Sequence, residues 1–388
     1  MDNLIVRIEK LIWRGRGLAR LDSGQVILVD PPVLPDELVQ VKIFKKNRDF
    51  LQGKVHKIIE PSPIRRLHPC KHGHQCGGCT FGVAPNSQIL KIKKQILIDA
   101  LTRNLKKSLN TDLLDKIELI PSRKSWRYRF RSQIYVHQKK PHFKKLGSNE
   151  LVRLSDCLLL ATPLGRGLDK LASHMPNGRF IVAASPEDGR IAWQGQKTLL
   201  DFSLPEFNIT LQLPPHIFFQ AHWLQNQALV SLVVEELRHY TRIADLYAGA
   251  GNFSLPLARS GQMVLAVEEC QDAVRAGELN ARKLGLDLVK FRAHDLRKKA
   301  PWEKVKNFDP QAVIIDPPRT GSPDLWKKID YLANVEKMVW ISCDVVNTCR
   351  DMKRFLNQGW QLGRIYLVDM FPQTWHMEVV FVLVREGR

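Results

Sequence analysis

The chain has 388 residues, of which 44% are hydrophobic, and it carries a net charge of +20. This composition excludes a disordered chain, and the absence of any apolar run near the roughly 18 residues of a membrane-spanning helix excludes a membrane-spanning one. The length predicts two or three domains. The excess of Lys and Arg favours a polyanionic partner such as nucleic acid. The first residues lack a signal-peptide pattern, so we expect a cytoplasmic protein that makes no membrane contact.

Residues 1–60 are predicted to form a small β-barrel. The short runs LIVRIEKLI, GQVILVD, LVQVKIF and GKVHKII alternate apolar and polar residues, and Gly, Pro and Asp turn signals separate them. The sequence Pro-Ser-Pro at 61–63 marks a boundary. We therefore expect a first domain over residues 1–60.

Residues 61–214 are predicted to form a mixed α+β domain. A cysteine cluster comes first, then a helical stretch near 86–107 and strands such as SQIYVH and FIVAAS. Residues 61–145 hold 19 Lys and Arg against 4 Asp and Glu. Aromatic rings alternate with arginines in the run Trp126–Arg131, a pattern that suits single-stranded or looped RNA, with arginines on phosphates and rings stacked on bases.

Residues 215–388 alternate strands and helices, which predicts an α/β domain with a doubly wound, mainly parallel sheet. The turn Asp245–Gly251 follows a strand and precedes a helix. Glu268, Asp295 and Asp316 end the following strands, at the sheet edge where such folds bind ligands. Acidic groups at this edge favour the cationic S-adenosylmethionine over a pyrophosphate cofactor. Ordinary turns of an α/β domain are the alternative.

Three further residues point to a reaction site. Cys343 ends the strand VWISC and is either an exposed nucleophile or a buried thiol. Arg319 lies in the rigid loop Asp316-Pro-Pro-Arg-Thr-Gly321. Glu378 directly precedes the strand-like run VVFVLV, where it is expected to be either a general base or a strand cap.

These motifs together resemble the 5-methyluridine RNA methyltransferases, in particular the iron–sulfur-containing bacterial 23S ribosomal RNA type. The resemblance runs nearly end to end, and residues 1–60 look like a TRAM domain. The matching residues are Phe219-Gln220, Asp245–Phe253, Asp316–Gly321, Ser342-Cys343, Arg350-Asp351 and Asp369–Glu378.

The resemblance implies a Rossmann-like methyltransferase domain, preceded by a TRAM- or OB-like barrel and an α+β iron–sulfur domain. It implies that Cys343 adds to C6 of uridine and that Glu378 removes the C5 proton. The target uridine is expected to be unpaired or flipped out, in ribosomal rather than transfer RNA, and the enzyme to be a monomer. The positions that match the family's S-adenosylmethionine contacts are Gln220, Tyr247, Asn252, Glu268, Asp295 and Asp316.

The cysteine cluster predicts an inorganic site. Cys70, Cys76 and Cys79 surround a Gly-Gly turn, and Cys157 is the candidate fourth ligand. Spacing alone fits Cys₄ zinc as well as a [4Fe–4S] cluster, and nearby histidines add Cys/His zinc alternatives. The resemblance favours [4Fe–4S], with a structural or RNA-positioning role. The histidines of the zinc alternatives are His68, His72 and His74. The remaining thiols, Cys270 and Cys349, are expected to be buried or half-buried on helices.

The chain departs from the family pattern at two places. Asp344-Val345 stands where Asn-Pro is usual, and an acid there should raise the pKa of Cys343 unless Arg319 or Arg350 compensates. His222 replaces the usual Asn two residues after the glutamine. Two rivals therefore remain, a base-amino methyltransferase and a non-catalytic RNA-binding protein, and transfer RNA remains an alternative substrate.

Overall fold

The computed structural model describes residues 3–385. The chain forms two compact units, one made of residues up to Arg103 with Lys144–Val152 and Phe371–His376, the other of Asn104–Phe143, Arg153–Met370 and the chain from Met377. The expected domain limits at residues 60 and 214 stay a prediction. In the described part of the chain, no helix is long and apolar enough to cross a membrane.

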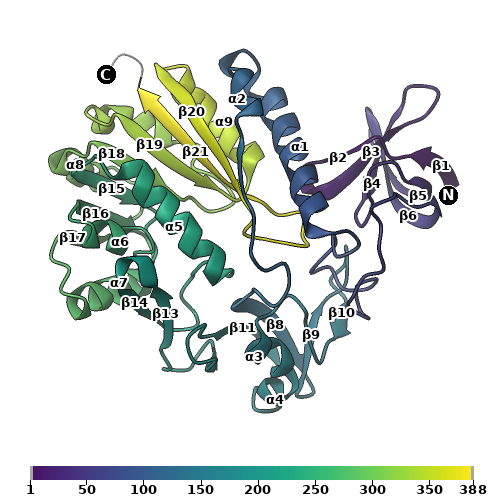
Figure 1. Ribbon diagram of the computed structural model, residues 1–388, viewed down its shortest axis with the longest axis horizontal. Coiled ribbons are helices and arrows are strands. Elements are labelled where there is room, and N and C mark those ends of the chain that lie inside the picture. Colours follow the sequence, from purple (N-terminus) through teal and green to yellow (C-terminus); the bar gives the residue numbers. More distant parts are fainter. Residues whose placement is uncertain (1–2, 386–388) are drawn as a thin grey trace. The chain divides into compact units, whose positions relative to one another are not determined.

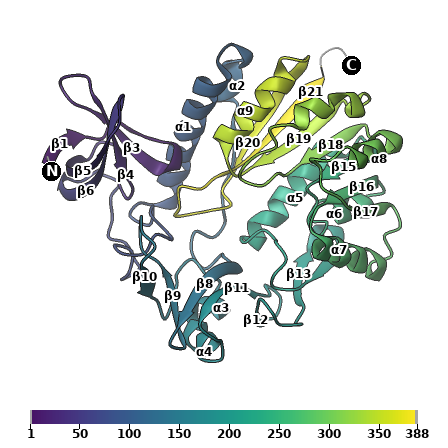
Figure 2. The same ribbon diagram turned by 180° about the vertical axis from the view of Figure 1, so that it is seen from behind.

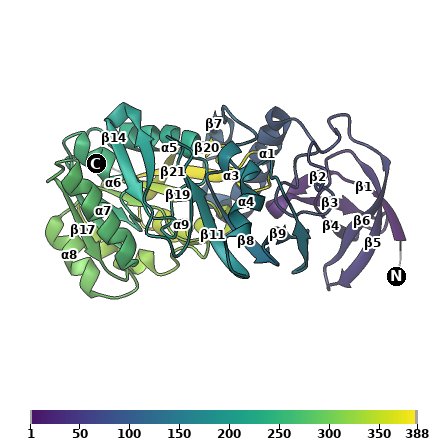
Figure 3. The ribbon, with the colours of Figure 1, turned by 90° about the horizontal axis from the view of Figure 1, so that it is seen from below.

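The first unit begins with a six-stranded sheet, drawn in purple in Figures 1 and 3. Its strand order is β1-β5-β6-β4-β3-β2, and neighbours are antiparallel except β4 and β6. Along β5, Val39, Val41 and Ile43 are buried while Lys42 and Phe44 are exposed, which is the alternation of a half-buried strand. The strands are β1 (Asn3–Arg7), β2 (Lys10–Ile12), β3 (Arg16–Arg20), β4 (Val26–Asp30), β5 (Leu38–Lys46) and β6 (Phe50–Glu60).

One long helix follows, α1 (Asn86–Leu105), which confirms the helical stretch expected near 86–107. Its interior has neither Gly nor Pro, and buried Ile89, Leu97 and Leu101 recur at helical spacing. A short strand, β10, spans Leu151–Arg153. Short 3₁₀ turns occur at Trp13–Gly15 and at Lys106–Ser108.

The second unit contains a small antiparallel sheet in which β9, β8, β11 and β12 lie side by side in that order. Helices α3 and α4 pack on it around buried Leu164 and Leu168. A hairpin of β13 and β14 follows. The elements are α2 (Asp112–Asp115), β7 (Glu118–Ile120), β8 (Arg131–His137), β9 (Lys140–Lys144), α3 (Thr162–Arg166), α4 (Leu168–Ser173), β11 (Gly178–Ala184), β12 (Ile191–Trp193), β13 (Leu200–Leu204) and β14 (Ile209–Leu213).

An eight-stranded sheet dominates the second unit, in the order β17-β16-β15-β18-β19-β21-β20-β7. Strands β15 to β19 are parallel, as predicted, and β21 is antiparallel to both β19 and β20. The strands are β15 (Arg242–Leu246), β16 (Met263–Glu268), β17 (Val289–Ala293), β18 (Ala312–Ile315), β19 (Lys337–Ser342), β20 (Trp360–Val368) and β21 (Glu378–Arg385).

Helices connect these strands (Figure 1). They are α5 (Trp223–Leu237), α6 (Ser254–Arg259), α7 (Gln271–Lys283), α8 (Ala300–Phe308) and α9 (Val345–Leu356), with a 3₁₀ stretch at Leu325–Leu332. The chain order reverses between β15 and β18, and the carboxyl ends of parallel strands on either side of such a reversal form a crevice for ligands.

Candidate active site

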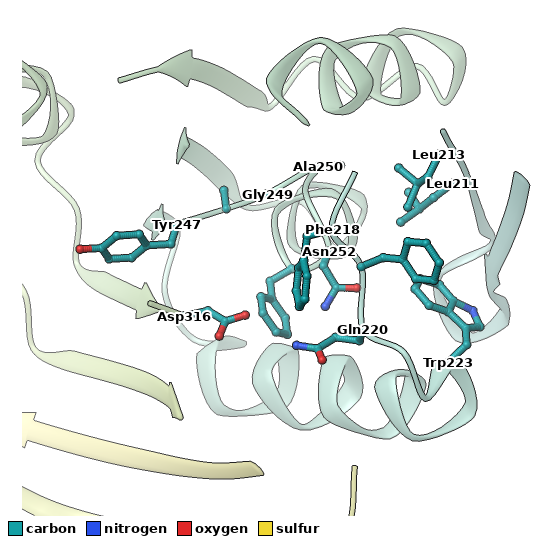
Figure 4. A pocket seen from close by; sticks show the side chains of 13 residues that line it. Leu211, Leu213, Phe218, Gln220, Trp223, Tyr247, Gly249, Ala250, Asn252 and Asp316 are labelled. Carbon is teal, nitrogen blue, oxygen red and sulfur yellow. The ribbon is translucent and has the colours of Figure 1, made fainter. Parts of the chain in front are cut away.

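A cavity of about 460 Å³ opens at the carboxyl ends of β15 and β18. Apolar side chains from three segments line much of it, and Gln220, Asn252 and Asp316 bring polar groups to it. Figure 4 shows the two amides and the carboxylate directed toward one another. The apolar residues are Leu211, Leu213, Phe218, Phe219, Trp223 and Phe253.

The turn after β15 is built for close approach of a ligand. Gly249 and Gly251 have φ of +56° and +90°, a region that favours glycine. A Cβ on Gly251 would come 2.7 Å from Cζ of Phe291. Glu268 fastens the turn, because its carboxylate accepts from the backbone N of Gly249 at 2.9 Å and of Cys270 at 2.8 Å.

Buried carboxyl groups lie beneath this turn. Asp245 is buried, and its Oδ2 accepts from Oγ of Ser254 at 2.5 Å. Its Oδ1 has no hydrogen-bond partner among residues 3–385. Burial, and secondarily the Glu268 charge, raises the pKa of Asp245 to about 7. Burial, then the charges of Asp245 and Glu268, likewise raises the pKa of Asp316 to about 7. Because burial and mutual repulsion disfavour the charged forms of these carboxyl groups, a ligand that carries a positive charge would be favoured beside them.

The structure brings together only some of the residues expected to bind the cofactor. Gln220, Asn252, Asp316 and Tyr247 line the cavity. The phenol of Tyr247 points away from the other labelled groups in Figure 4, and its oxygen lies 2.6 Å from Oγ of Ser322. Of the described residues expected to bind the cofactor, Glu268 and Asp295 do not line the cavity. Asp295 instead accepts from the backbone N and Nε of Arg297, at 2.9 and 2.8 Å.

The sheet register places Cys343 beside Glu378. Strands β19 and β21 are antiparallel and their ladder ends at the pair Ser342–Val379, so Cys343 and Glu378 each adjoin that last pair. Pro317, Arg319 and Asp344 lie around Cys343.

The charges around the Cys343 thiol oppose its ionisation. Burial raises the pKa of Cys343 to about 12, with further contributions from Glu378, Asp316 and Asp344, while Arg319 lowers it. Burial also raises the pKa of Glu378 well above its usual value, helped by Asp316 and opposed by Arg319. The thiol of Cys343 therefore holds its proton near neutral pH, and burial disfavours the charged form of Glu378.

Helix α9 fixes the loop that carries Arg319. Nδ2 of Asn347 donates to the Arg319 carbonyl at 2.8 Å. Buried Asp351 accepts from the backbone N of Ser322 at 2.7 Å, and a Cβ on Gly321 would come 2.3 Å from Oδ2 of Asp351. Asn347 and this role of Asp351 were not foreseen from the sequence. The match of Arg350-Asp351 to a family motif was the available signal.

The departure at Asp344 has a structural role. Its Oδ1 accepts from the backbone N of Asn347 at 3.0 Å, which caps the first turn of α9. Asp and Asn are about equally good caps. The acid therefore substitutes for Asn in capping the helix while it adds a negative charge beside the thiol.

The arginine-rich run Trp126–Arg131 makes contacts within the second unit, and its expected contact with RNA stays a prediction. Tyr128 is buried and its ring stacks on His222, with centroids 4.5 Å apart. Arg127 donates twice to Asp156 at 2.6 Å, and Cζ of Arg131 lies 5.5 Å from the Phe218 ring centre. Backbone pairing of Phe130 with Ala221 fixes the run against the chain beside Gln220. The run thus supports the cavity from within the second unit.

His222, the second departure, is a buried cap rather than an exposed group. Its Nδ1 accepts from the backbone N of Gln225 at 3.3 Å at the start of α5, and its Nε2 lies 2.7 Å from Oγ of Ser122. Burial lowers the pKa of His222 to about 4, so the ring is neutral at pH 7.

The four cysteines expected to hold an inorganic centre are divided between the two units, and their role as ligands stays a prediction. In the first unit Cys76 and Cys79 are buried and Cys70 is half-buried, and Sγ of Cys79 lies 3.4 Å from Nε2 of His68. Cys157 belongs to the second unit, against the core around Leu164. Within residues 3–385 no group of three or more His, Cys, Asp or Glu is arranged to hold a metal ion.

The two remaining thiols differ from each other. Cys349 is buried on α9, as expected. The expectation for Cys270 is wrong, because this residue is exposed and precedes the first residue of α7. A helix N-cap position projects from the end of the helix rather than from its packed face, which accounts for the exposure.

Residues 206–386 match a family model described as tRNA (uracil-5-)-methyltransferase, and residues 4–56 match the TRAM domain. The 23S rRNA (uracil(1939)-C(5))-methyltransferase RlmD of Shewanella halifaxensis is 30% identical over 433 residues, covering 97% of this chain and 94% of the relative. An uncharacterized RNA methyltransferase of Thermotoga maritima is 28% identical over 448 residues, covering 99% of both chains.

A solved structure has the same fold. The tRNA (uracil-54, C5)-methyltransferase of Pyrococcus abyssi, in complex with S-adenosyl-L-homocysteine, matches with a TM-score of 0.74 at 19% identity, over 99% of this chain and all of the other. These matches confirm the TRAM domain and the Rossmann-like methyltransferase fold that the sequence predicted.

Proposed function

Because this chain belongs to the family of RNA uracil-5-methyltransferases, we propose that it methylates C5 of a uridine in 23S ribosomal RNA through a covalent bond to Cys343. The observation that supports this mechanism is that Cys343 and Glu378 each adjoin the Ser342–Val379 pair that ends the ladder between β19 and β21, and that the charge of Glu378 acts on the thiol. A nucleophile and a base side by side are what C5 substitution requires.

The cavity at the end of β15 fits S-adenosylmethionine. Its apolar wall, its glycine turn and the buried Asp245 beneath it suit an uncharged ring system together with a cationic centre. Gln220, Asn252 and Asp316 would hold the cofactor, and Glu268 would act through the turn that it fastens. When bound, the cofactor supplies an electrophilic methyl group.

The residues of the reaction site account for the remaining chemistry. C5 of uridine is a weak nucleophile, and addition of the Cys343 thiolate to C6 moves an electron pair into the ring as an enolate. C5 would then form a bond to the methyl group while the bond from that methyl group to the sulfonium sulfur breaks, and S-adenosylhomocysteine would leave. Glu378 takes the proton from C5, the C5–C6 double bond reforms, and the bond from sulfur to C6 breaks. Arg319 favours the thiolate, because it opposes the neighbouring acids.

The choice of ribosomal RNA rests on the full-length relatives named as 23S rRNA methyltransferases, while the Pyrococcus structure supports transfer RNA as the alternative. The target uridine is flipped out or unpaired, since C6 and C5 of a stacked base are out of reach, and the enzyme acts as a monomer. The TRAM-like sheet offers a contact for single-stranded RNA. Phe44 is 47% exposed, and Nζ of Lys54 lies 5.5 Å from its ring centre.

The [4Fe–4S] cluster stays a prediction that rests on the resemblance alone, and no step of the mechanism passes through it. Iron, acid-labile sulfide and zinc determined in anaerobically purified protein test it directly. Four irons per chain that are lost in a Cys79→Ala variant would support the cluster, and zinc at one per chain would support the alternative.

The proposal is tested with labelled S-adenosylmethionine and separate unmodified 23S ribosomal and transfer RNA, followed by mass spectrometry of the nucleosides. We expect labelled 5-methyluridine in 23S RNA. Cys343→Ala should abolish turnover while it retains cofactor binding, and Cys270→Ala, at the exposed thiol, is the matched control. Glu378→Gln should slow turnover by about 10²–10⁴-fold and accumulate a denaturation-resistant protein–RNA adduct.

The outcomes separate the alternatives. Labelled 5-methyluridine in transfer RNA alone would retain the mechanism and change the substrate. A labelled exocyclic amino group, or full activity of Cys343→Ala, would favour a base-amino methyltransferase. RNA binding without any transfer of label would indicate a non-catalytic protein.

A further inference from the structure

The segment just before Glu378 takes an unusual course. The chain leaves the second unit after Met370, belongs to the first unit as Phe371–His376, and returns to the second unit at Met377. Glu378 is the next residue and the first of β21. The segment therefore ends one residue short of the group that we propose as the base.

Polar contacts within the first unit hold this segment. Lys93 of α1 is fully buried, and its Nζ donates to the Phe371 carbonyl at 2.8 Å. The backbone N of Phe81 donates to the Gln373 carbonyl at 3.0 Å. Figures 1 and 2 show the loop in yellow beside α1. A buried ammonium is retained only where its hydrogen bonds are made, so this contact defines where Phe371 lies.

The centre of the segment is a constrained backbone. Gln373 has φ of +63° although it is not glycine, and its side chain is fully buried. Nη2 of Arg66 lies 3.5 Å from its Oε1, and its backbone N donates to Oδ1 of Asn86 at 3.4 Å. Such a conformation persists only where the surroundings enforce it, and constrained residues of this kind gather at functional sites.

The 3₁₀ turn between β2 and β3 contacts the end of the same segment. The rings of Trp13 and Trp375 meet edge to face with centroids 5.9 Å apart. A Cβ on Gly15 would come 2.8 Å from Cβ of Trp375 and 2.9 Å from Cζ of Phe81. Gly15 therefore allows an approach that a larger residue would block.

We propose that Phe371–His376 is a positioning segment for Glu378, and that Lys93 and Gln373 are positioning residues for proton removal. The contacts of Lys93 and Gln373 fix the backbone that directly precedes Glu378 along the chain, and thereby restrict the carboxylate that must reach the C5 proton. This inference rests on the proposed role of Glu378. A merely structural connection would affect folding or RNA binding but not the step at which Glu378 acts.

The test compares Lys93→Met with Lys91→Met, an exposed lysine of the same helix. We expect Lys93→Met to lower kcat by about 10- to 100-fold, the cost of a small displacement of a reacting group, with unchanged KM for RNA and cofactor affinity. Because addition and methyl transfer precede proton removal, the methylated Cys343 adduct should accumulate on denaturing gels. Lys91→Met should behave as the unmodified protein does.

A second variant tests the same inference in case Lys93→Met fails to fold. Gln373→Gly removes the buried side chain and suits the positive φ, so the fold should be kept while the segment loosens, and the adduct should again accumulate. In a Glu378→Gln background neither change should lower kcat further. The inference alone would be overturned if folded Gln373→Gly or Lys93→Met had unchanged kcat and formed no adduct, while Glu378→Gln did form the adduct. No adduct in Glu378→Gln itself would overturn the proposed function.

Discussion

Replacement of Asp344 by asparagine isolates one charge at the reaction site. Asp344 contributes to the raised pKa of Cys343, after burial and the acids Glu378 and Asp316. It also caps α9 through the backbone N of Asn347. Asparagine caps a helix about as well as aspartate does. The variant therefore removes the negative charge beside the thiol and keeps the helix start intact.

The size of the effect follows from screened electrostatics. Asp344 is half-buried, and a unit charge a few ångströms away in a largely hydrated setting contributes about 1 kcal/mol. That energy corresponds to about fivefold more thiolate. A thiolate of lower pKa is also a weaker nucleophile, with a Brønsted coefficient of about 0.4–0.5, so about two- to threefold should remain in the rate of addition.

Two measurements follow this effect. The first is kcat/KM between pH 7 and 9, where activity should rise with pH because thiolate is scarce. The second is iodoacetamide alkylation of individual cysteines, read by peptide mass spectrometry, with exposed Cys270 as the internal standard. Asp344→Ala should give the same gain in alkylation, but a less stable protein by about 1 kcal/mol, because it also loses the cap.

The reasoning would be refuted by a folded Asp344→Asn whose alkylation and kcat/KM are unchanged or lower. That result would mean that the charge of Asp344 does not act on the thiol, and that Asn347 or substrate contacts control the site instead. A gain in alkylation without a gain in kcat/KM would place the slow step after addition.

Three further predictions concern groups whose pKa values depend on burial or on a neighbouring charge. Arg319→Met removes the cation that lowers the pKa of Cys343 and Glu378, so kcat/KM should fall roughly tenfold and recover in part as pH rises, with cofactor affinity unchanged. Burial holds the pKa of His222 near 4, below its ordinary 6.5. The unfolded chain then binds a proton that the native chain excludes, so stability falls as pH drops from about 6.5 to about 4, and His222→Asn should remove this part of the loss in urea midpoints. Burial raises the pKa of Asp245 from 3.8 to about 7, which has the opposite sign. Stability should fall as pH rises through that range, and Asp245→Asn should flatten this slope, whereas an unchanged slope would show that Asp245 is not the group responsible.

The sequence by itself determined the elements of this protein and the kind of chemistry they carry. Alternation in 1–60 and the strand–helix order after 215 are local signals, because each segment must bury one face of fixed period. The residue types at the strand ends, an acid at Asp316 and a thiol at Cys343, follow directly from the strands once their ends are located. Membership of a known family was readable from the same motifs.

Only the tertiary structure decided which of those residues meet. Asp295 follows a strand of the expected sheet, yet its carboxylate turns to Arg297. The rings and arginines of Trp126–Arg131 read as an RNA-binding pattern, yet Tyr128 is buried against His222. Residue type and spacing do not specify which face of a segment is covered, because another segment far along the chain covers it.

The same limit applies to the reaction site. That Cys343 and Glu378 both adjoin the Ser342–Val379 pair depends on the register of β19 against β21, which the pattern of each strand leaves free. That Phe371–His376 belongs to the first unit depends on Lys93 and Phe81, whose contacts with it are nonlocal. Local sequence fixes what each side chain can do, and packing between distant segments decides what it is placed to do.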